Sequence, residues 1–179
     1  MATANDVQRL RSETGAGVMD SKKALEAAEG DFEKAKAILK EKGLASAAKR
    51  GDRATKEGVI EAYIHGGGRI GALVELSSET DFVARNPEFR DLAKAIAMQV
   101  AAMSPKHVSW ELLKDEEIKA LLEEHGDEKT AKAAAVLMHQ PYIKDQSKTI
   151  GDLVTQLAAS TGENIKISRI ARFQLGEAA

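Results

Sequence analysis

The side chains that usually carry nucleophilic or metal chemistry are few in this chain of 179 residues. It has no cysteine, which excludes thiolate nucleophiles, disulfides and cysteine-built metal sites. No two of its four histidines stand at metal-ligand spacing: His65, His107, His125 and His139. No serine, histidine and aspartate share a sequence context that would expose a nucleophile. We therefore expect no enzyme, no metal site and no cofactor.

Two stretches could contact phosphate, and both have a simpler interpretation. HGGGRIG at 65–71 lies between two expected strands instead of opening a helix, so we interpret it as a hairpin turn. The basic residues Lys49, Arg50, Arg53 and Lys56 lack stacking aromatics, which favours a linker or a protein contact. The net charge of −2 gives no signal for polyanion binding, so we expect no direct nucleic-acid partner.

Aromatic residues make up only 4% of the chain, so each one calls for an explanation. Phe32, Phe89 and Phe173 fall on expected helices or strands, where we expect them to pack. Phe82 lies in the polar stretch TDFV, outside the apolar stripes on either side. It either folds back into the core or protrudes as an apolar wedge beside a carboxylate, as in a protein-binding hot spot. Met19 also has two possible roles. It either forms a hydrophobic staple with Ala24 or stays exposed as an apolar contact.

The first 43 residues predict three short helices that form a compact module with a small core. Each expected helix begins at a capping residue and ends at a glycine: Thr3 or Asn5 with Gly15, Asp20 with Gly30, and Asp31 with Gly43. The segment 44–57 is polar, alanine-rich and basic, with no apolar stripe. We expect it to hold a short helix and a linker to a second region.

The second region, 58–179, predicts an antiparallel sheet with helices on one face. Strands are expected at 59–65 and 69–76, joined by three glycines, and again within 164–176. In that last stretch the apolar alternation slips between Ile167 and Ile170, which predicts a β-bulge. Helices are expected after Asn86, within 108–140 and from Ile150. The fold class is therefore α+β.

We expect no targeting signal and no membrane-spanning segment in this sequence. No run approaches the ~18 apolar residues of a membrane span, and the first residues lack the apolar core of a signal peptide. We expect a soluble, cytoplasmic protein with no membrane partner.

Several segments together resemble the bacterial elongation factor Ts family, the guanine-nucleotide exchange factors for elongation factor Tu. They are LRSETGAGVMDSKKALEAAEGDFEKAKAILKEKG at 10–43, ELSSETDFVARNPEF at 75–89 and GENIKISRIARFQLG at 162–176, with further matches at 65–75 and 140–153. The segments follow the family's order and cover most of the chain. The combination of TGAGVMD with TDFVARN is the most specific part of the resemblance.

The resemblance implies a fold, a function and a set of contact residues. It implies a UBA-like three-helix module at 1–43, a linker at 44–57 and an α+β dimerisation core at 58–179. The implied function is to bind elongation factor Tu with GDP, disturb its magnesium and phosphate site and release GDP during translation elongation. The contact residues implied for the exchange wedge are Thr80, Asp81, Phe82 and Val83, and those implied for N-terminal docking are Arg9, Val18 and Met19.

The chain is similar to a short form of the family with a single core, whereas long members carry two core subdomains. Short forms are expected to form homodimers, which here would be noncovalent because cysteine is absent. The alternative function is a helical adaptor that binds a different protein through its N-terminal module. Measurement of GDP release from elongation factor Tu separates the two.

Overall fold

The computed structural model describes residues 3–177, and these fall into two compact units. The N-terminal unit comprises the chain up to Arg53 together with Thr155–Asn164. The core unit comprises Ala54–Val154 and the segment that starts at Ile165. In the described range, no helix has the length and apolar character needed to cross a membrane.

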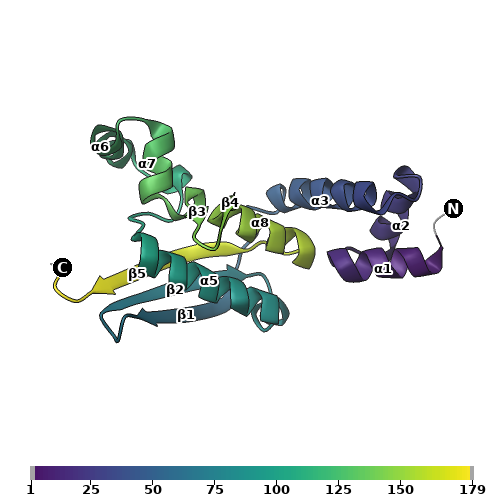
Figure 1. Cartoon of the computed structure of the whole chain (residues 1–179), viewed down its shortest axis with the longest axis horizontal. Coiled ribbons are helices and arrows are strands. Elements are labelled where there is room, and N and C mark those ends of the chain that lie inside the picture. The colour runs from purple at the N-terminus through teal and green to yellow at the C-terminus, as the bar shows by residue number, and fades with distance from the viewer. Residues whose placement is uncertain (1–2, 178–179) are drawn as a thin grey trace. The chain divides into compact units, whose positions relative to one another are not determined.

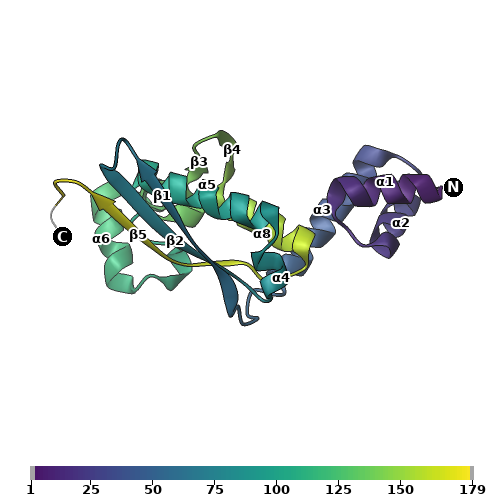
Figure 2. The same cartoon turned by 90° about the horizontal axis from the view of Figure 1, so that it is seen from below.

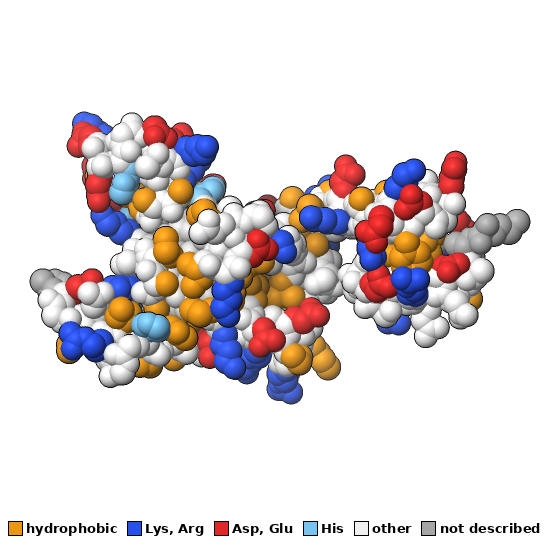
Figure 3. Space-filling view, in the orientation of Figure 1, with side chains coloured by type: hydrophobic (Ala, Val, Ile, Leu, Met, Phe, Trp, Pro, Cys, Tyr) orange, Lys and Arg blue, Asp and Glu red, His pale blue; other side chains and the backbone are white. Residues whose placement is uncertain are grey.

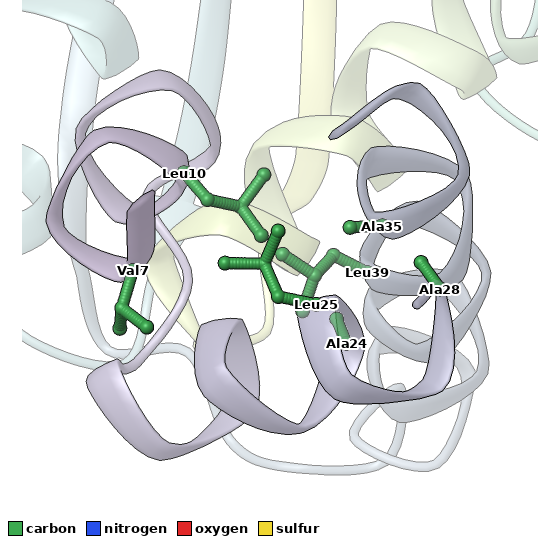
Figure 4. Packing of buried hydrophobic residues seen from close by; sticks show 7 residues of the cluster. All are labelled: Val7, Leu10, Ala24, Leu25, Ala28, Ala35 and Leu39. Atoms are coloured by element: carbon green, nitrogen blue, oxygen red, sulfur yellow. The ribbon is translucent and has the colours of Figure 1, made fainter. Parts of the chain in front are cut away.

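The N-terminal unit contains the three expected helices, α1 (Ala4–Thr14), α2 (Val18–Ala27) and α3 (Phe32–Ala48). Thr3 caps α1 in a capping box with Asp6, and Asp31 caps α3 by accepting from the Lys34 amide, as predicted. Gly15 ends α1 in the left-handed conformation, with a φ of 69°. In Figure 4, three leucines of the small core converge from the three helices: Leu10, Leu25 and Leu39.

Two predicted helix boundaries are wrong. Helix α2 begins at Val18 after Gly17, so Asp20 lies in its first turn, where its carboxylate pairs with Lys42 of α3. Helix α3 continues past Gly43 to Ala48. Gly43 lies inside the helix and permits close packing, since a Cβ there would lie 3.0 Å from the Ala159 Cβ. The alanine-rich sequence that follows favours continued helix.

The core unit is built on one antiparallel sheet in the order β1–β2–β5, from β1 (Glu57–His65), β2 (Ile70–Ser78) and β5 (Lys166–Gln174). Gly66, Gly67 and Gly68 all have positive φ, which confirms the hairpin turn. The predicted bulge is also confirmed. Glu75 pairs with Arg169 and Leu76 with Ile167, so one extra residue of β5 lies between these pairs.

Helix α5 (Pro87–Met103) covers one face of this sheet, as Figure 2 shows. Its buried stripe meets the inward side chains of β2, and the Arg172 Nε of β5 donates to the Ala101 carbonyl. The side chains that β2 and α5 place in this layer are almost fully buried: Ala72, Val74 and Leu76 from β2, and Phe89, Ile96 and Val100 from α5. The core therefore lies between the sheet and α5.

The opposite face of the sheet carries several exposed apolar side chains and the Glu75–Arg169 ion pair. Ile60, Ala62 and Ile64 share a face, as predicted, but it is this outer one. The exposed fractions are 65% for Ile60, 66% for Ile64 and 69% for Phe173. The prediction that Phe173 packs in the core is therefore wrong. Its partner in the ladder is Gly71, so it shares the outer face with Ile64 and Leu73. We call Ile60, Ile64, Leu73 and Phe173 the outer sheet face.

The remaining elements connect this sheet to its helices. A one-turn helix, α4 (Asp81–Ala84), follows β2, and the expected helical stretch within 108–140 contains the 3₁₀ turn η1 (Trp110–Leu112), α6 (Asp115–His125), α7 (Glu128–Ala135) and η2 (Leu137–His139). Trp110 packs on a small α6–α7 cluster. The short hairpin of β3 (Pro141–Tyr142) and β4 (Asp145–Thr149) was not predicted, and α8 (Ile150–Thr161) was.

Candidate functional site

The segment Thr80–Val83, which we call the wedge segment, forms most of the one-turn helix α4 between β2 and α5. Thr80 precedes the helix in an extended conformation, and the Ala84 amide donates to its carbonyl at 3.3 Å. Asn86 then caps α5 by accepting from the Glu88 amide, with Pro87 as the first helical residue. The segment around Phe82 is therefore a helical turn and not an irregular loop.

The turn presents one side to the core and the other to solvent. Ala84 is 5% exposed, whereas Phe82 is 85% exposed, more than any other large hydrophobic residue described. Residues two positions apart on a helix point about 200° apart, so burial of Ala84 turns Phe82 outward. The alternative that Phe82 folds back into the core is thereby ruled out. Asp81 and Val83 are of intermediate exposure.

Asp81 places a carboxylate next to this exposed ring. Its Oδ2 lies 3.0 Å from Nη2 of Arg85, and both side chains are substantially exposed. An exposed pair of this kind is weak because water and salt screen it. The carboxylate is therefore readily available for other hydrogen-bond donors or cations.

The three residues that the resemblance implies for docking lie on two different helices. Val18 and Met19 lie in the first turn of α2 and are 55% and 61% exposed, so Met19 does not form a buried staple. Arg9 lies on α1, where its guanidinium stacks over the Phe32 ring at 4.6 Å and its Nε pairs with Glu13 at 2.9 Å.

Glu13 joins Arg9 to α3. Its second carboxylate oxygen pairs with Lys36 at 2.7 Å. The Lys36 ammonium, and then the Arg9 guanidinium, hold the pKa of Glu13 below its usual value, and Glu13 raises the pKa of Lys36. Arg9 thus already has a structural role between α1 and α3, which its sequence position did not reveal.

A shallow groove lies beside Val18 on the same unit. It is lined by Ala4, Val7, Gln8, Arg11, Val18 and Lys22. Ala4, Gln8 and Arg11 were not singled out from the sequence, although their i, i+4, i+7 spacing places them on one face of α1. The lining combines apolar side chains with two basic residues, Arg11 and Lys22.

Of the basic residues that the sequence singled out in the linker, Arg50 has local partners. Arg50 donates to the Ser46 hydroxyl and the Ala158 carbonyl within the N-terminal unit. No cluster of three or more metal-ligating side chains occurs among residues 3–177. Basic and acidic side chains are interspersed over the surface seen in Figure 3, in keeping with the small net charge.

Comparison with known proteins identifies the family. The family model described as elongation factor TS matches residues 4–133. The elongation factor Ts of Finegoldia magna is 48% identical over 202 aligned positions, which cover 98% of this chain and 90% of that protein. The elongation factor Ts of Thermotoga neapolitana is 48% identical, over 96% of this chain and 95% of that protein. The elongation factor Ts of Caldanaerobacter subterraneus is 50% identical, over 99% of this chain and 98% of that protein. The chain therefore belongs to the elongation factor Ts family, in the short form that these relatives share.

Proposed function

We propose that this chain releases GDP from elongation factor Tu by inserting the wedge segment near the bound nucleotide. The family is that of the exchange factor for elongation factor Tu, so the chain is an exchange factor and not a catalytic enzyme. The observation that carries the role of the wedge is the 85% exposure of Phe82 on a turn whose other side is buried. We place this activity in the cytoplasm, without direct contact to nucleic acid or membrane.

The chemistry of the partner's nucleotide site explains how a wedge acts. In a GTPase, Mg²⁺ and a backbone loop hold the diphosphate through charge and hydrogen bonds that depend on exact positions. The Phe82 ring gains free energy when it leaves water for an apolar pocket of the partner. The adjoining Asp81 carboxylate competes for donors that otherwise serve the phosphate or the cation. Both effects favour the state without nucleotide.

The exchange itself follows from linkage. A factor that binds the nucleotide-free partner more tightly than the GDP-bound partner lowers the affinity for GDP by the same ratio. No covalent bond is made or broken by the factor. The wedge segment therefore needs rigid placement and an exposed ring, and it does not need a catalytic acid or base.

We propose that the N-terminal unit supplies a second contact through Val18, Met19 and the groove next to Val18. Apolar side chains exposed in a first helical turn suit a helix of the partner with a complementary face. Two contacts on one partner raise the overall affinity, because the second forms at a high effective concentration. We propose that residues 1–43 dock on the partner and that the core at 58–179 promotes nucleotide release. Residues 44–57 link the two.

The outer sheet face supports a second proposal, that the chain forms a noncovalent homodimer. Its four side chains are exposed, and three of them line a hollow together with Leu175: Ile64, Leu73 and Phe173. Large exposed apolar patches mark interaction surfaces. A second copy would supply an identical apolar face, as a two-fold interface requires.

Release of labelled GDP from elongation factor Tu tests the function. Substoichiometric amounts of the wild-type chain should accelerate release, and Phe82→Ala should abolish most of the acceleration. Leu112→Ala is the matched control, because Leu112 is 79% exposed and lies outside the proposed contacts. Unchanged release with the wild-type chain would rule out the exchange function, whereas equal activity of Phe82→Ala would rule out the wedge alone.

A further inference from the structure

The wedge segment lies on a helix too short to be stable without neighbours. Helix α4 has four residues, and a single helical turn fixes several backbone angles for very few hydrogen bonds. Within the turn, the Ala84 amide bonds to Thr80 O at 3.3 Å and the Arg85 amide to Asp81 O at 3.0 Å. These two bonds alone would leave the turn frayed, so its geometry depends on contacts from neighbouring elements.

Side chains from two different elements bind the carbonyls at the two ends of the turn. From β2, the Ser78 hydroxyl donates to Thr80 O at 3.0 Å. From α5, the Arg90 Nε donates to Ala84 O at 3.2 Å. Ser78 is fully buried and so is held in place by the core. Phe82 lies midway between the two bound carbonyls.

Arg90 differs from Ser78 in being exposed. It is one residue beyond the buried Phe89 in the first turn of α5, and its amide bonds to Asn86 O. Its side chain reaches back past Asn86 and Pro87 to the end of α4. The contact therefore ties the wedge segment to the helix that covers the sheet, and it contributes little to the core.

We propose that Arg90 is a positioning residue for the wedge: its Nε holds the end of α4 so that Phe82 is presented in one direction before the partner binds. The proposal rests on the wedge role of Phe82 argued above. A preordered turn lets Phe82 bind without first losing conformational entropy, and a loose turn reduces the fraction of molecules ready to bind. The partner contacts Phe82, and Arg90 acts through the backbone of Ala84.

A pair of substitutions separates the hydrogen bond from the charge. Glutamine has a nitrogen donor, Nε2, at the same distance along the side chain as the arginine Nε, whereas methionine has a methyl group there. Both residues remove the guanidinium, and their helix propensities are close to that of arginine. Arg90→Gln therefore keeps the donor to Ala84 O, and Arg90→Met removes it.

The first measurement is the second-order rate constant for factor-stimulated GDP release. It should fall about fivefold in Arg90→Met, as expected for loss of one hydrogen bond, and stay within about twofold of wild type in Arg90→Gln. In the Phe82→Ala background, Arg90→Met should have no further effect. Equal loss in both Arg90 variants would overturn the proposal, because it would mean that the guanidinium itself meets the partner. Wild-type rates in both would also overturn it.

The second measurement needs no partner and keeps the test independent of the exchange function. Hydrogen exchange followed by NMR should show faster exchange of the Ala84 and Arg85 amides in Arg90→Met than in Arg90→Gln or wild type. The thermal midpoint should stay the same in all three. If wild type fails to stimulate GDP release, the proposed function falls, and these amide rates still decide whether Arg90 holds the turn. Equal amide rates in all three proteins would overturn the positioning role.

Discussion

Phe82 and Ala84 stand two residues apart on α4, and they differ in exposure by the widest margin within the turn, 85% against 5%. Ala84 is small enough to lie against the core, so the rotation of the turn follows from its burial. The direction of Phe82 is then set by helix geometry. The burial of Ala84 thus keeps Phe82 facing solvent.

This relationship predicts a small stability effect at Phe82 and a large one at Ala84. Phe82→Ala should change the free energy of unfolding by less than about 0.5 kcal/mol, because the ring makes few contacts. Ala84→Leu should cost about 1–3 kcal/mol through overpacking, and it should also slow GDP release by rotating the turn. Urea unfolding of both variants measures this. A large stability loss in Phe82→Ala would show that the ring contributes to the core after all.

Docking through α2 predicts a change in affinity with little change in fold. Val18→Ser and Met19→Ser should each raise the factor concentration needed for half-maximal exchange, because each removes exposed apolar surface that binding would bury. Titration of the factor in the GDP-release assay measures this concentration. Glu26→Gln serves as a control, since Glu26 is an exposed residue of the same helix in a long pair with Lys22, 3.8 Å apart. Unchanged half-maximal concentrations would remove α2 from the interface.

The outer sheet face predicts dimerisation that a single charge can prevent. Light scattering should give twice the chain mass of 19.2 kDa for wild type. Phe173→Glu should give the mass of one chain, because a dimer would bury two unpaired carboxylates. Circular dichroism should show the same fold in both, since Phe173 is 69% exposed. A monomeric wild type at micromolar concentration would contradict the dimer.

The Glu13 contacts predict acid-dependent stability. The folded-state pKa of Glu13 is lowered below its usual 4.5, chiefly by Lys36 and then by Arg9. Its stabilising effect is therefore complete above that value and is lost as the pH falls through the lowered folded-state pKa. The difference in unfolding free energy between wild type and Glu13→Gln should be constant near neutral pH and shrink below about pH 4.5. Urea unfolding over a pH series tests this, and a difference that persists unchanged at low pH would refute it.

A buried amide pair predicts a large stability effect away from the proposed contacts. Gln99 of α5 donates to the Gln140 side chain at 3.2 Å and to Pro141 O at 3.1 Å, and it accepts from the Ile143 amide at 3.0 Å. Gln99→Met keeps the volume but leaves these groups without a partner, which should cost about 2–4 kcal/mol. Chemical denaturation measures the loss. The GDP-release rate of the folded variant should match wild type. A specific loss of exchange would show that this hydrogen-bond network contributes to exchange.

The amino-acid sequence by itself determined most of the elements and singled out the candidate contact residues. Capping residues such as Thr3 and Asp31 act through neighbours three positions away, and the bulge near Ser168 shows as a slip in alternation, so both are local signals. TDFV stood out because an aromatic residue in a polar stretch breaks the local pattern. These features could be predicted because they depend on interactions between residues close together in the chain.

Tertiary structure decided whatever depends on residues far apart in the chain. Gly43 lies inside α3 and permits close packing against Ala159. Phe173 faces outward because the ladder places it opposite Gly71, on the side away from α5. Arg90 holds the wedge segment only because α5 begins beside the end of α4. Which face is covered, and which carbonyl a side chain reaches, depends on long-range packing that spacing along the chain does not encode.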